Sequence, residues 1–117
     1  HMLRRITAVF ERSSDAVTVQ DFEGHILSWN RTAEKLYGWS EEEATHMHIT
    51  DITAESHRQE YAAKTRLLQR GEKVAPFETV RIPKNGAPIS VWVYASTLVA
   101  GNHQPADFAT FERPIDR

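Results

Sequence analysis

One densely punctuated run, residues 21–43, most constrains how this chain can fold; it reads DFEGHILSWNRTAEKLYGWSEEE. Within it, the pair Glu23-Gly24 predicts a tight turn between two strands. Asn30 predicts the start of a helix, because its side chain accepts hydrogen bonds from the first free helix amides. Gly38 predicts the end of that helix, because glycine readily adopts the left-handed closing conformation. The run therefore predicts a strand hairpin that leads directly into a short helix.

The rest of the chain predicts more helices and three further strands. Ser40 with Glu43 forms a capping-box pattern, which predicts another helical turn. Asn85-Gly86 is the strongest short hairpin signal in the sequence. The expected helical segments cover residues 3–12, 31–37, 49–53 and 54–70, the last ended by Gly71. The expected strands cover residues 16–20, 25–29, 75–83, 88–100 and 106–113.

These motifs resemble those of the PAS sensor domain. The opening run is similar to the family pattern D-x-x-G-x-I-x-x-x-N-x-A-A-E-x-L-x-G-[YFW]-S-x-E-E. FETVRIPKNG at 77–86 resembles the family's F-E-x-x-x-x-x-K-[DN]-G hairpin, and ISVWVYAS at 89–96 its following strand. RPID at 113–116 resembles the closing R-D-I-T. The resemblance implies an α+β fold: a five-stranded antiparallel sheet with helices on one face and an N-terminal amphipathic helix.

The expected organisation is one domain. Residues 1–2 are interpreted as a cloning scar, 3–12 as a helix for dimerisation or linkage, and 13–117 as the PAS domain. A net charge of -2 gives no electrostatic reason to expect nucleic acid or a membrane surface as a partner. No signal peptide or membrane-spanning run is visible, so we expect a cytoplasmic module. The absence of cysteine excludes disulfides and, within the family, both photochemistries that need a thiol.

A ligand, if one binds, is expected between the inner sheet face and the long helix, where apolar walls with a few polar groups would hold it. The same side chains would fill a solid core under the alternative interpretation. The expected wall residues are Val17, Val19, Trp29, Leu36, Ile52, Tyr61, Thr65, Leu68, Phe77, Val91, Val93, Ala95, Phe108 and Thr110.

The long strand at 88–100 separates two faces, because successive side chains point in opposite directions. Ile89, Val91, Val93 and Ala95 would face the interior, which leaves Trp92 and Tyr94 outside. Either the first helix of the same chain covers these aromatics, or helix and sheet form a homodimer contact, as the resemblance implies. The expected dimer face consists of Leu3, Ile6, Val9, Phe10, Trp92 and Tyr94.

Cofactor and metal sites have weak support in the sequence. Haem-binding relatives place a histidine three residues before a tyrosine; here His57 lies four before Tyr61, with Arg58 in the ligand's place. We therefore expect no cofactor, although haem and non-covalent flavin stay open. His46 and His48 with Asp51 could approach a metal, but a fourth ligand is lacking, so no metal site is predicted.

No catalytic residues are predicted, and the chain is not expected to be an enzyme. Glu41, Glu42 and Glu43 open a helical turn, where negative charge complements the helix dipole. Glu34 is expected to form a structural salt bridge with Lys84, as the resemblance implies.

The expected function is that of a sensory module. It would bind a small ligand or dimerise, and would relay a conformational change to a C-terminal output domain, with a histidine kinase as the leading expectation. The alternative is a ligand-free homodimerisation or protein-interaction module of a diguanylate cyclase or transcription regulator. Pro114 replaces the aspartate of the closing motif and so removes an acceptor and an amide donor at the junction.

Overall fold

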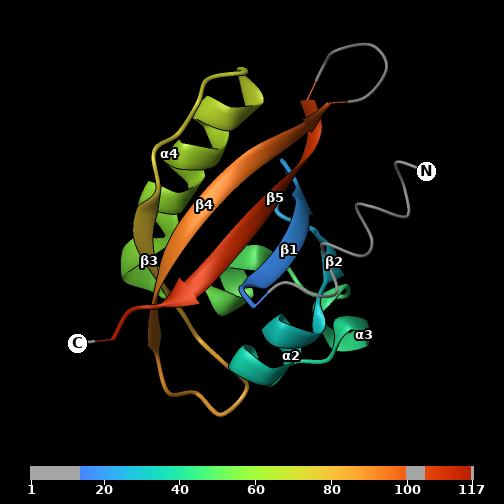
Figure 1. Cartoon of the computed structure of the whole chain (residues 1–117), viewed down its shortest axis with the longest axis vertical. Helices are drawn as coiled ribbons and strands as arrows, with labels where there is room; N and C mark the ends of the chain where they lie inside the picture. The colour runs from blue at the N-terminus through green and yellow to red at the C-terminus, as the bar shows by residue number, and fades with distance from the viewer. Residues whose placement is uncertain (1–13, 100–104, 117) are drawn as a thin grey trace.

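The computed structural model describes residues 14–99 and 105–116. Within them, five antiparallel strands form one sheet in the order β2-β1-β5-β4-β3 (Figure 1). The strands are β1 (Ala16–Asp21), β2 (Ile26–Trp29), β3 (Phe77–Arg81), β4 (Ile89–Val99) and β5 (Pro105–Pro114). Between β2 and β3 lie α2 (Arg31–Tyr37), α3 (Glu41–Ala44), η1 (Ile49–Ile52), η2 (Glu55–His57) and α4 (Arg58–Gln69). The predicted fold class is confirmed; the helix expected at 3–12, with Leu3, Ile6, Val9 and Phe10, lies outside the described residues.

Strand β5 occupies the centre of the sheet. It pairs with β1 along one edge, where Ala16 faces Glu112, and with β4 along the other, where Tyr94 faces Phe111. The last strand of the chain therefore lies between the first strand and the longest one (Figure 1).

The helix-capping residues of the run 21–43 act as predicted. Asn30 is fully buried and its Oδ1 accepts hydrogen bonds from the backbone amides of Ala33 and Val17, each at 2.9 Å. One side chain thus starts α2 and also fixes that helix to β1. Gly38 ends α2 with φ of 80°, in the left-handed region that glycine adopts without steric cost.

Two predicted boundaries were wrong. The long helix does not begin at residue 54 as an α-helix: a 3-10 turn, η2, precedes α4, and neither segment has a side-chain cap at its start. The β3–β4 hairpin forms where Asn85-Gly86 predicted it, with the Gly86 amide donating to the Pro83 carbonyl at 2.9 Å, but β3 is shorter than the expected 75–83 and ends at Arg81. Pro83 and Pro88 flank that turn, and because proline has no amide proton the strands cannot continue their ladder through it.

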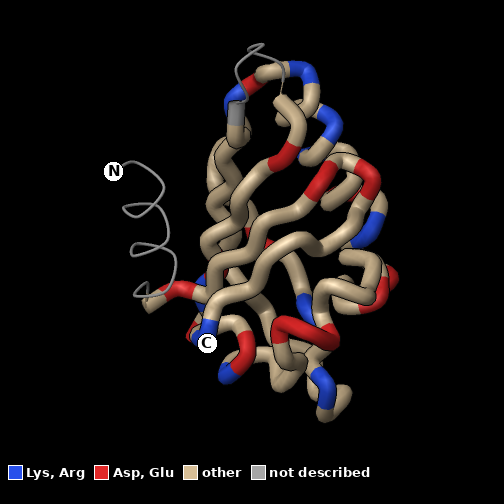
Figure 2. The backbone as a smooth tube through the Cα atoms, turned by 90° about the vertical axis from the view of Figure 1, so that its right-hand side faces the viewer, with Lys and Arg blue, Asp and Glu red and all other residues tan. Residues whose placement is uncertain are grey.

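The two faces of β4 separate as the alternation predicted. Val91 and Val93 are fully buried and Ala95 nearly so, whereas Trp92 and Tyr94 are each 50% exposed. The helices pack on the buried face of the sheet (Figure 1). Charged residues of both signs lie scattered over loops, helices and strand ends (Figure 2). Within the described residues, no helix is both long and apolar enough to cross a membrane.

Candidate ligand cavity and buried polar network

A cavity of about 120 Å³ lies where the β1–β2 turn, η1 and α4 meet, and it is partly open to solvent. Phe22, Ile49 and Phe108 supply apolar wall, and the rings of Phe22 and Phe108 pack 5.1 Å apart. The polar part of the wall comes from two elements: Gln20 lies on β1 and Arg58 at the start of α4. The cavity thus combines aromatic surface with a buried amide and a guanidinium.

Three of the wall residues expected from the sequence line this cavity: Tyr61, Thr65 and Phe108. The expected position was between the inner sheet face and the long helix; buried side chains fill most of that space, and the cavity lies at one end of it, beside the end of β1. The other expected wall residues lie elsewhere in the fold: Val17, Trp29, Ile52, Leu68, Phe77, Val91, Val93, Ala95 and Thr110 are buried, and Val19 and Leu36 are half-buried. Ligand binding by any of these residues stays a prediction.

A buried ion pair between Arg81 and Glu112 lies on the inner, helix-covered face of the sheet. The Arg81 guanidinium donates to both carboxylate oxygens of Glu112, with Nε–Oε1 and Nη2–Oε2 distances of 2.9 Å. Arg81 also donates to the Thr53 hydroxyl at 2.7 Å, and its guanidinium lies 4.6 Å from the centre of the Tyr61 ring. The hydroxyl of Tyr37 donates to Glu112 at 2.6 Å. The pair therefore joins β3 and β5 to α2, η1 and α4.

A chain of hydrogen bonds leads from the cavity wall to this ion pair. Tyr61 donates its hydroxyl proton to Gln20 Oε1 at 2.9 Å, and Gln20 Nε2 donates to the Thr18 hydroxyl at 2.9 Å. The hydroxyls of Thr18 and Thr110 are 2.5 Å apart, and Thr110 donates to Glu112 at 2.8 Å. Because a threonine has only one hydroxyl proton, Thr18 must donate to Thr110. From Gln20 on, every bond donates toward the Glu112 carboxylate, an arrangement in which each bond polarises the next.

Burial and the charges within the network shift the pKa values of its titrating groups. Burial alone would raise the pKa of Glu112, but the charge and hydrogen bonds of Arg81 outweigh it and hold the pKa below its ordinary value. Burial would lower the pKa of Arg81, whereas the Glu112 charge raises it well beyond its ordinary value. Burial, and then the Glu112 charge, raise the pKa of Tyr37 well above its ordinary value. The pKa of Tyr61 is raised chiefly by burial. The pair is therefore ionised and both tyrosines are neutral near pH 7.

The sequence analysis missed Arg81, Glu112, Gln20 and Thr18. Charged residues usually lie on a surface, so nothing in their residue type suggested burial. The alternation of side chains along β3 could have indicated that Arg81 is buried, because Arg81 lies on the same face of the strand as Phe77 and Thr79, and all three are buried. Two opposite charges at inward positions of different strands would have indicated a buried pair.

The expected Glu34–Lys84 salt bridge is wrong. Lys84 Nζ instead pairs with Glu43 Oε2 at 2.6 Å. The capping box explains the change, because the other oxygen of Glu43 accepts from the Ser40 amide and so holds the carboxylate beside Lys84. Glu34 has a different partner: it accepts from the backbone amide of Glu41 at 2.7 Å, at the start of α3.

The residues do not fit a haem. The ring of His57 contacts Ser56 at 2.8 Å and does not line the cavity, whereas Arg58, one position further along the helix, does. A cavity of 120 Å³ compares with engineered cavities that hold benzene, so neither a haem nor the three-ring system of a flavin fits in it.

The histidines considered for a metal have separate partners. His46 Nδ1 lies 2.8 Å from the carbonyl oxygen of Glu42, at the exposed end of α3. His48 accepts at Nδ1 from the Thr50 amide at 3.2 Å, so its proton is on Nε2 and is donated to the Glu23 carbonyl at 2.7 Å. Asp51 accepts from the backbone amide of His48. His48 is thus a clamp between η1 and the β1–β2 turn.

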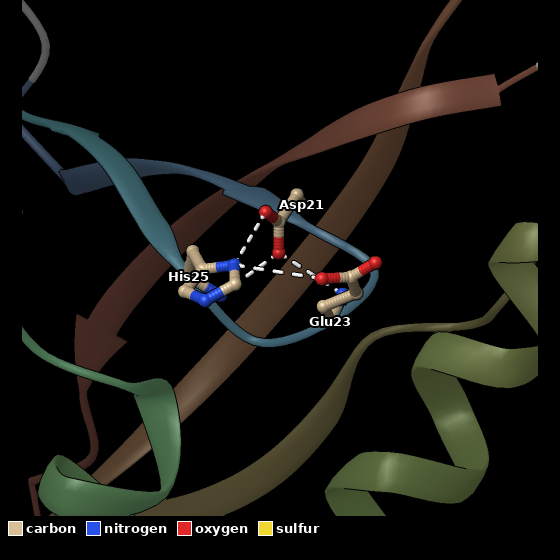
Figure 3. A group of neighbouring side chains, drawn as sticks. All are labelled: Asp21, Glu23 and His25. Carbon is tan, nitrogen blue, oxygen red and sulfur yellow. Dashed lines mark hydrogen bonds and ion pairs between the residues drawn. The ribbon is translucent and has the colours of Figure 1, made fainter.

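Another cluster, which the sequence analysis did not select, lies in that turn. The ligand-type atoms of Asp21, Glu23 and His25 all lie within 4.8 Å of one another (Figure 3). Asp21 accepts from the His25 ring at 2.8 Å and from the backbone amides of Glu23 and His25. Burial would raise the pKa of Asp21, but these hydrogen bonds lower it. The cluster closes the turn through its own hydrogen bonds.

Close packing in the turn depends on Gly24. Its φ is 98°, and a Cβ atom placed there would lie 2.2 Å from the His48 ring. Glycine therefore permits both the backbone conformation and the His48 clamp.

An open groove of about 440 Å³ lies on the outer face of the sheet. Trp92, Tyr94 and Phe111 form most of it, with Asp15, Pro76 and Arg113 at its edges. Arg113 pairs with Asp15 at 2.9 Å across the groove's polar edge. This groove contains the two residues of the expected dimer face that the structure describes.

Comparison with protein-family models matches residues 4–113 to the PAS fold. Among solved structures, a PAS domain from Colwellia psychrerythraea is 21% identical, with a TM-score of 0.84 over 98% of each chain. The PAS domain of an HTR-like protein from Haloarcula marismortui is 22% identical, with a TM-score of 0.76 over 97% of this chain and 92% of that one. A domain of a sensory box sensor histidine kinase/response regulator from Geobacter sulfurreducens is 20% identical, with a TM-score of 0.77 over 96% and 93%. Comparison with curated protein sequences found no match.

Proposed function

The chain belongs to the PAS fold family, and from that premise we propose that it is the sensory module of a signalling protein. It binds a small molecule in the cavity beside α4, and the resulting conformational change is relayed to a C-terminal output domain in the cytoplasm. A histidine kinase is the output domain we favour, because a similar domain belongs to a sensory box sensor histidine kinase/response regulator from Geobacter sulfurreducens.

The observation that supports this proposal most is the directional chain of hydrogen bonds from Gln20 to Glu112. Gln20 lines the cavity, whereas Glu112 lies two positions before the end of β5. A ligand that draws the Gln20 amide away from Thr18 changes the bonds available to Thr18 and Thr110, and hence those of Glu112. Two states with different ligand contacts are what a relay requires.

The experiment compares backbone amide chemical shifts of the chain carrying Gln20→Leu with those of the unmodified chain. We expect shifts at Glu112 and onward through residue 116, because the substitution removes the first donor of the chain. Thr18→Val interrupts the chain without changing the cavity wall, so Gln20→Leu should shift those amides much less in the Thr18→Val background.

Ile49→Val is the matched control, because the Ile49 side chain lines the cavity, whereas its link to the network runs through its backbone carbonyl, which accepts from Thr53 and is unchanged by the substitution. Its effect should stay near η1. If Gln20→Leu leaves residues 112–116 unchanged, the relay is refuted.

A second candidate function is a ligand-free homodimerisation module, for example in a diguanylate cyclase or a transcription regulator. The exposure of Trp92 and Tyr94, each 50%, favours it, because two large aromatics in one open groove are typical of an interaction surface. Together with Leu3, Ile6, Val9 and Phe10, they form the dimer face that we propose.

Native mass spectrometry and sedimentation of the purified chain separate the two candidates. A bound small molecule supports the sensory function, whereas a dimer without any ligand supports the second candidate. Trp92→Ser with Tyr94→Ser should weaken a dimer, while Leu27→Ser, which changes another exposed apolar residue (43% exposed), should not.

A further inference from the structure

We propose that the cavity takes a small organic monoanion, a carboxylate on a compact apolar body, and that Arg58 binds the carboxylate. This inference deepens the sensory function and rests on it for its biological meaning. It assigns a ligand chemistry to a site for which the family resemblance gives none.

The cavity's size and wall define the body of the ligand. About 120 Å³ suits a benzene-sized group, since an engineered apolar cavity of about 150 Å³ binds benzene. The rings of Phe22 and Phe108 and the side chain of Ile49 provide apolar contact for such a group. Because the cavity is partly open, a charged substituent can remain at the rim while the ring is buried.

Arg58 provides the positive charge at the rim. Its Nε donates to the Thr53 carbonyl oxygen at 3.1 Å, which anchors the guanidinium and leaves the two terminal nitrogens for another acceptor. Across residues 14–99 and 105–116, Arg58 forms no ion pair with a carboxylate. A planar guanidinium binds a carboxylate through two parallel hydrogen bonds, so a carboxylate ligand matches it well.

Two acidic residues also line the cavity, but their carboxylates face the β1–β2 turn or solvent and make no ion pair with Arg58. Asp21 accepts three hydrogen bonds from within the β1–β2 turn, two of them from His25 (Figure 3). The Glu23 side chain is 84% exposed and lies 3.9 Å from the His25 ring. Neither residue neutralises Arg58.

Gln20 provides a hydrogen-bond donor at the buried end of the cavity. Its carboxamide is fully buried and has two N–H protons, of which one is donated to Thr18. The second has no partner within the described part of the chain. Buried donors are normally satisfied, so a ligand oxygen at the inner end of the apolar body would be favoured. A hydroxylated aromatic carboxylate meets both requirements.

The test measures affinities by isothermal titration calorimetry at low ionic strength, with benzoate and its neutral isostere benzamide as probes. Benzoate should bind at least about tenfold more tightly, the ratio expected for one charge-assisted interaction. 4-Hydroxybenzoate should bind more tightly than benzoate, because its hydroxyl oxygen can accept from Gln20.

Arg58→Gln should abolish the preference for benzoate over benzamide. Arg66→Gln is the matched control, because Arg66 is an exposed arginine of the same helix that does not line the cavity. The benzoate preference should persist in that variant.

Equal affinity for benzoate and benzamide, no binding of either, or an unchanged preference in Arg58→Gln would each overturn the proposal. The comparison of benzoate with benzamide uses the unmodified chain, so it decides the matter even if Arg58→Gln does not fold. The sensory function is tested separately by the Gln20→Leu amide shifts, which need no ligand. A failure of the anion proposal with an intact relay is therefore distinguishable from a failure of both.

Discussion

Arg81 and Glu112 form a bidentate pair although they belong to strands that are not neighbours. Strand β4 lies between β3 and β5, so the Arg81 side chain reaches across β4 to meet Glu112. Adjacent strands are separated by about 4.8 Å, so β3 and β5 are two such spacings apart, a distance that only long side chains can span. Both side chains are essentially without solvent contact, at 0% and 1% exposure. The pair is thus a fully desolvated link beneath the sheet.

Removing one member of this pair should be costly. Arg81→Met leaves the Glu112 charge buried without its partner, and Glu112→Gln does the same to Arg81. Each should lower the free energy of unfolding by about 3–5 kcal/mol, measured by urea denaturation. The double variant Arg81→Met/Glu112→Leu should lose less than either single variant, because no buried charge remains. Additive losses would show that the two residues are not coupled.

Acid should destabilise the fold through Glu112. Its pKa is held below the ordinary value of 4.5 in the folded protein, so its contribution is complete above that pH. The contribution is lost as the pH falls through the lower folded-state pKa, because the unfolded chain then binds the proton more readily. Unfolding free energies measured from neutral to acidic pH should therefore decline below about 4.5.

The Arg81→Met/Glu112→Leu variant provides the comparison for this pH dependence. Its decline should be shallower, though still present, because the pKa values of Asp21 and Glu43 are lowered as well. An identical slope in both proteins would assign the acid sensitivity to other carboxylates.

The two glycines Gly24 and Gly71 should respond differently to alanine. Both have positive φ, of 98° and 82°, so alanine costs roughly 1–2 kcal/mol at either position. At Gly24 the new methyl group would also meet the His48 ring at 2.2 Å, whereas at Gly71 nothing lies within 4 Å. Thermal denaturation should show a clearly larger loss for Gly24→Ala. Equal losses would mean that the His48 clamp moves aside freely.

The partner of Lys84 can be identified by double-mutant cycles. Lys84→Met combined with Glu43→Gln should show coupling in the free energy of unfolding, and added salt should weaken it because the pair is exposed. The same cycle with Glu34→Gln should show none, since Glu34 contacts the Glu41 amide. Coupling to Glu34 would restore the pairing expected from the family pattern.

Local signals in the sequence were sufficient for the order of strands and helices, whereas the sheet architecture was expected from the resemblance to the PAS family. Asn30, Gly38 and the Ser40 capping box each act through the backbone next to them, so their effect can be read without tertiary information. The alternation along β4 likewise reports burial directly. The end of β3 was placed too late because Pro83, which lacks an amide proton, cannot extend the strand ladder towards the Asn85-Gly86 turn.

The site could be predicted only in part, because it depends on contacts between distant segments. Tyr61, Thr65 and Phe108 were expected near a ligand, but the cavity also needs the β1–β2 turn to close over η1. The partner of Arg81 is far away in the chain, and no local pattern identifies it. The choice of Glu43 over Glu34 for Lys84 likewise depends on how α3 is oriented by its cap.

The central position of β5 also has a consequence for biosynthesis. Until residues 105–114 have emerged from the ribosome, β1 and β4 have no neighbour on the edge that β5 will occupy. The β1–β5 contacts join segments separated by most of the chain, and such non-local pairing slows folding. The edge of β1 therefore stays open while residues 22–104 are made, whereas β4 waits only a few residues for its partner, and an edge without its neighbour is prone to aggregation.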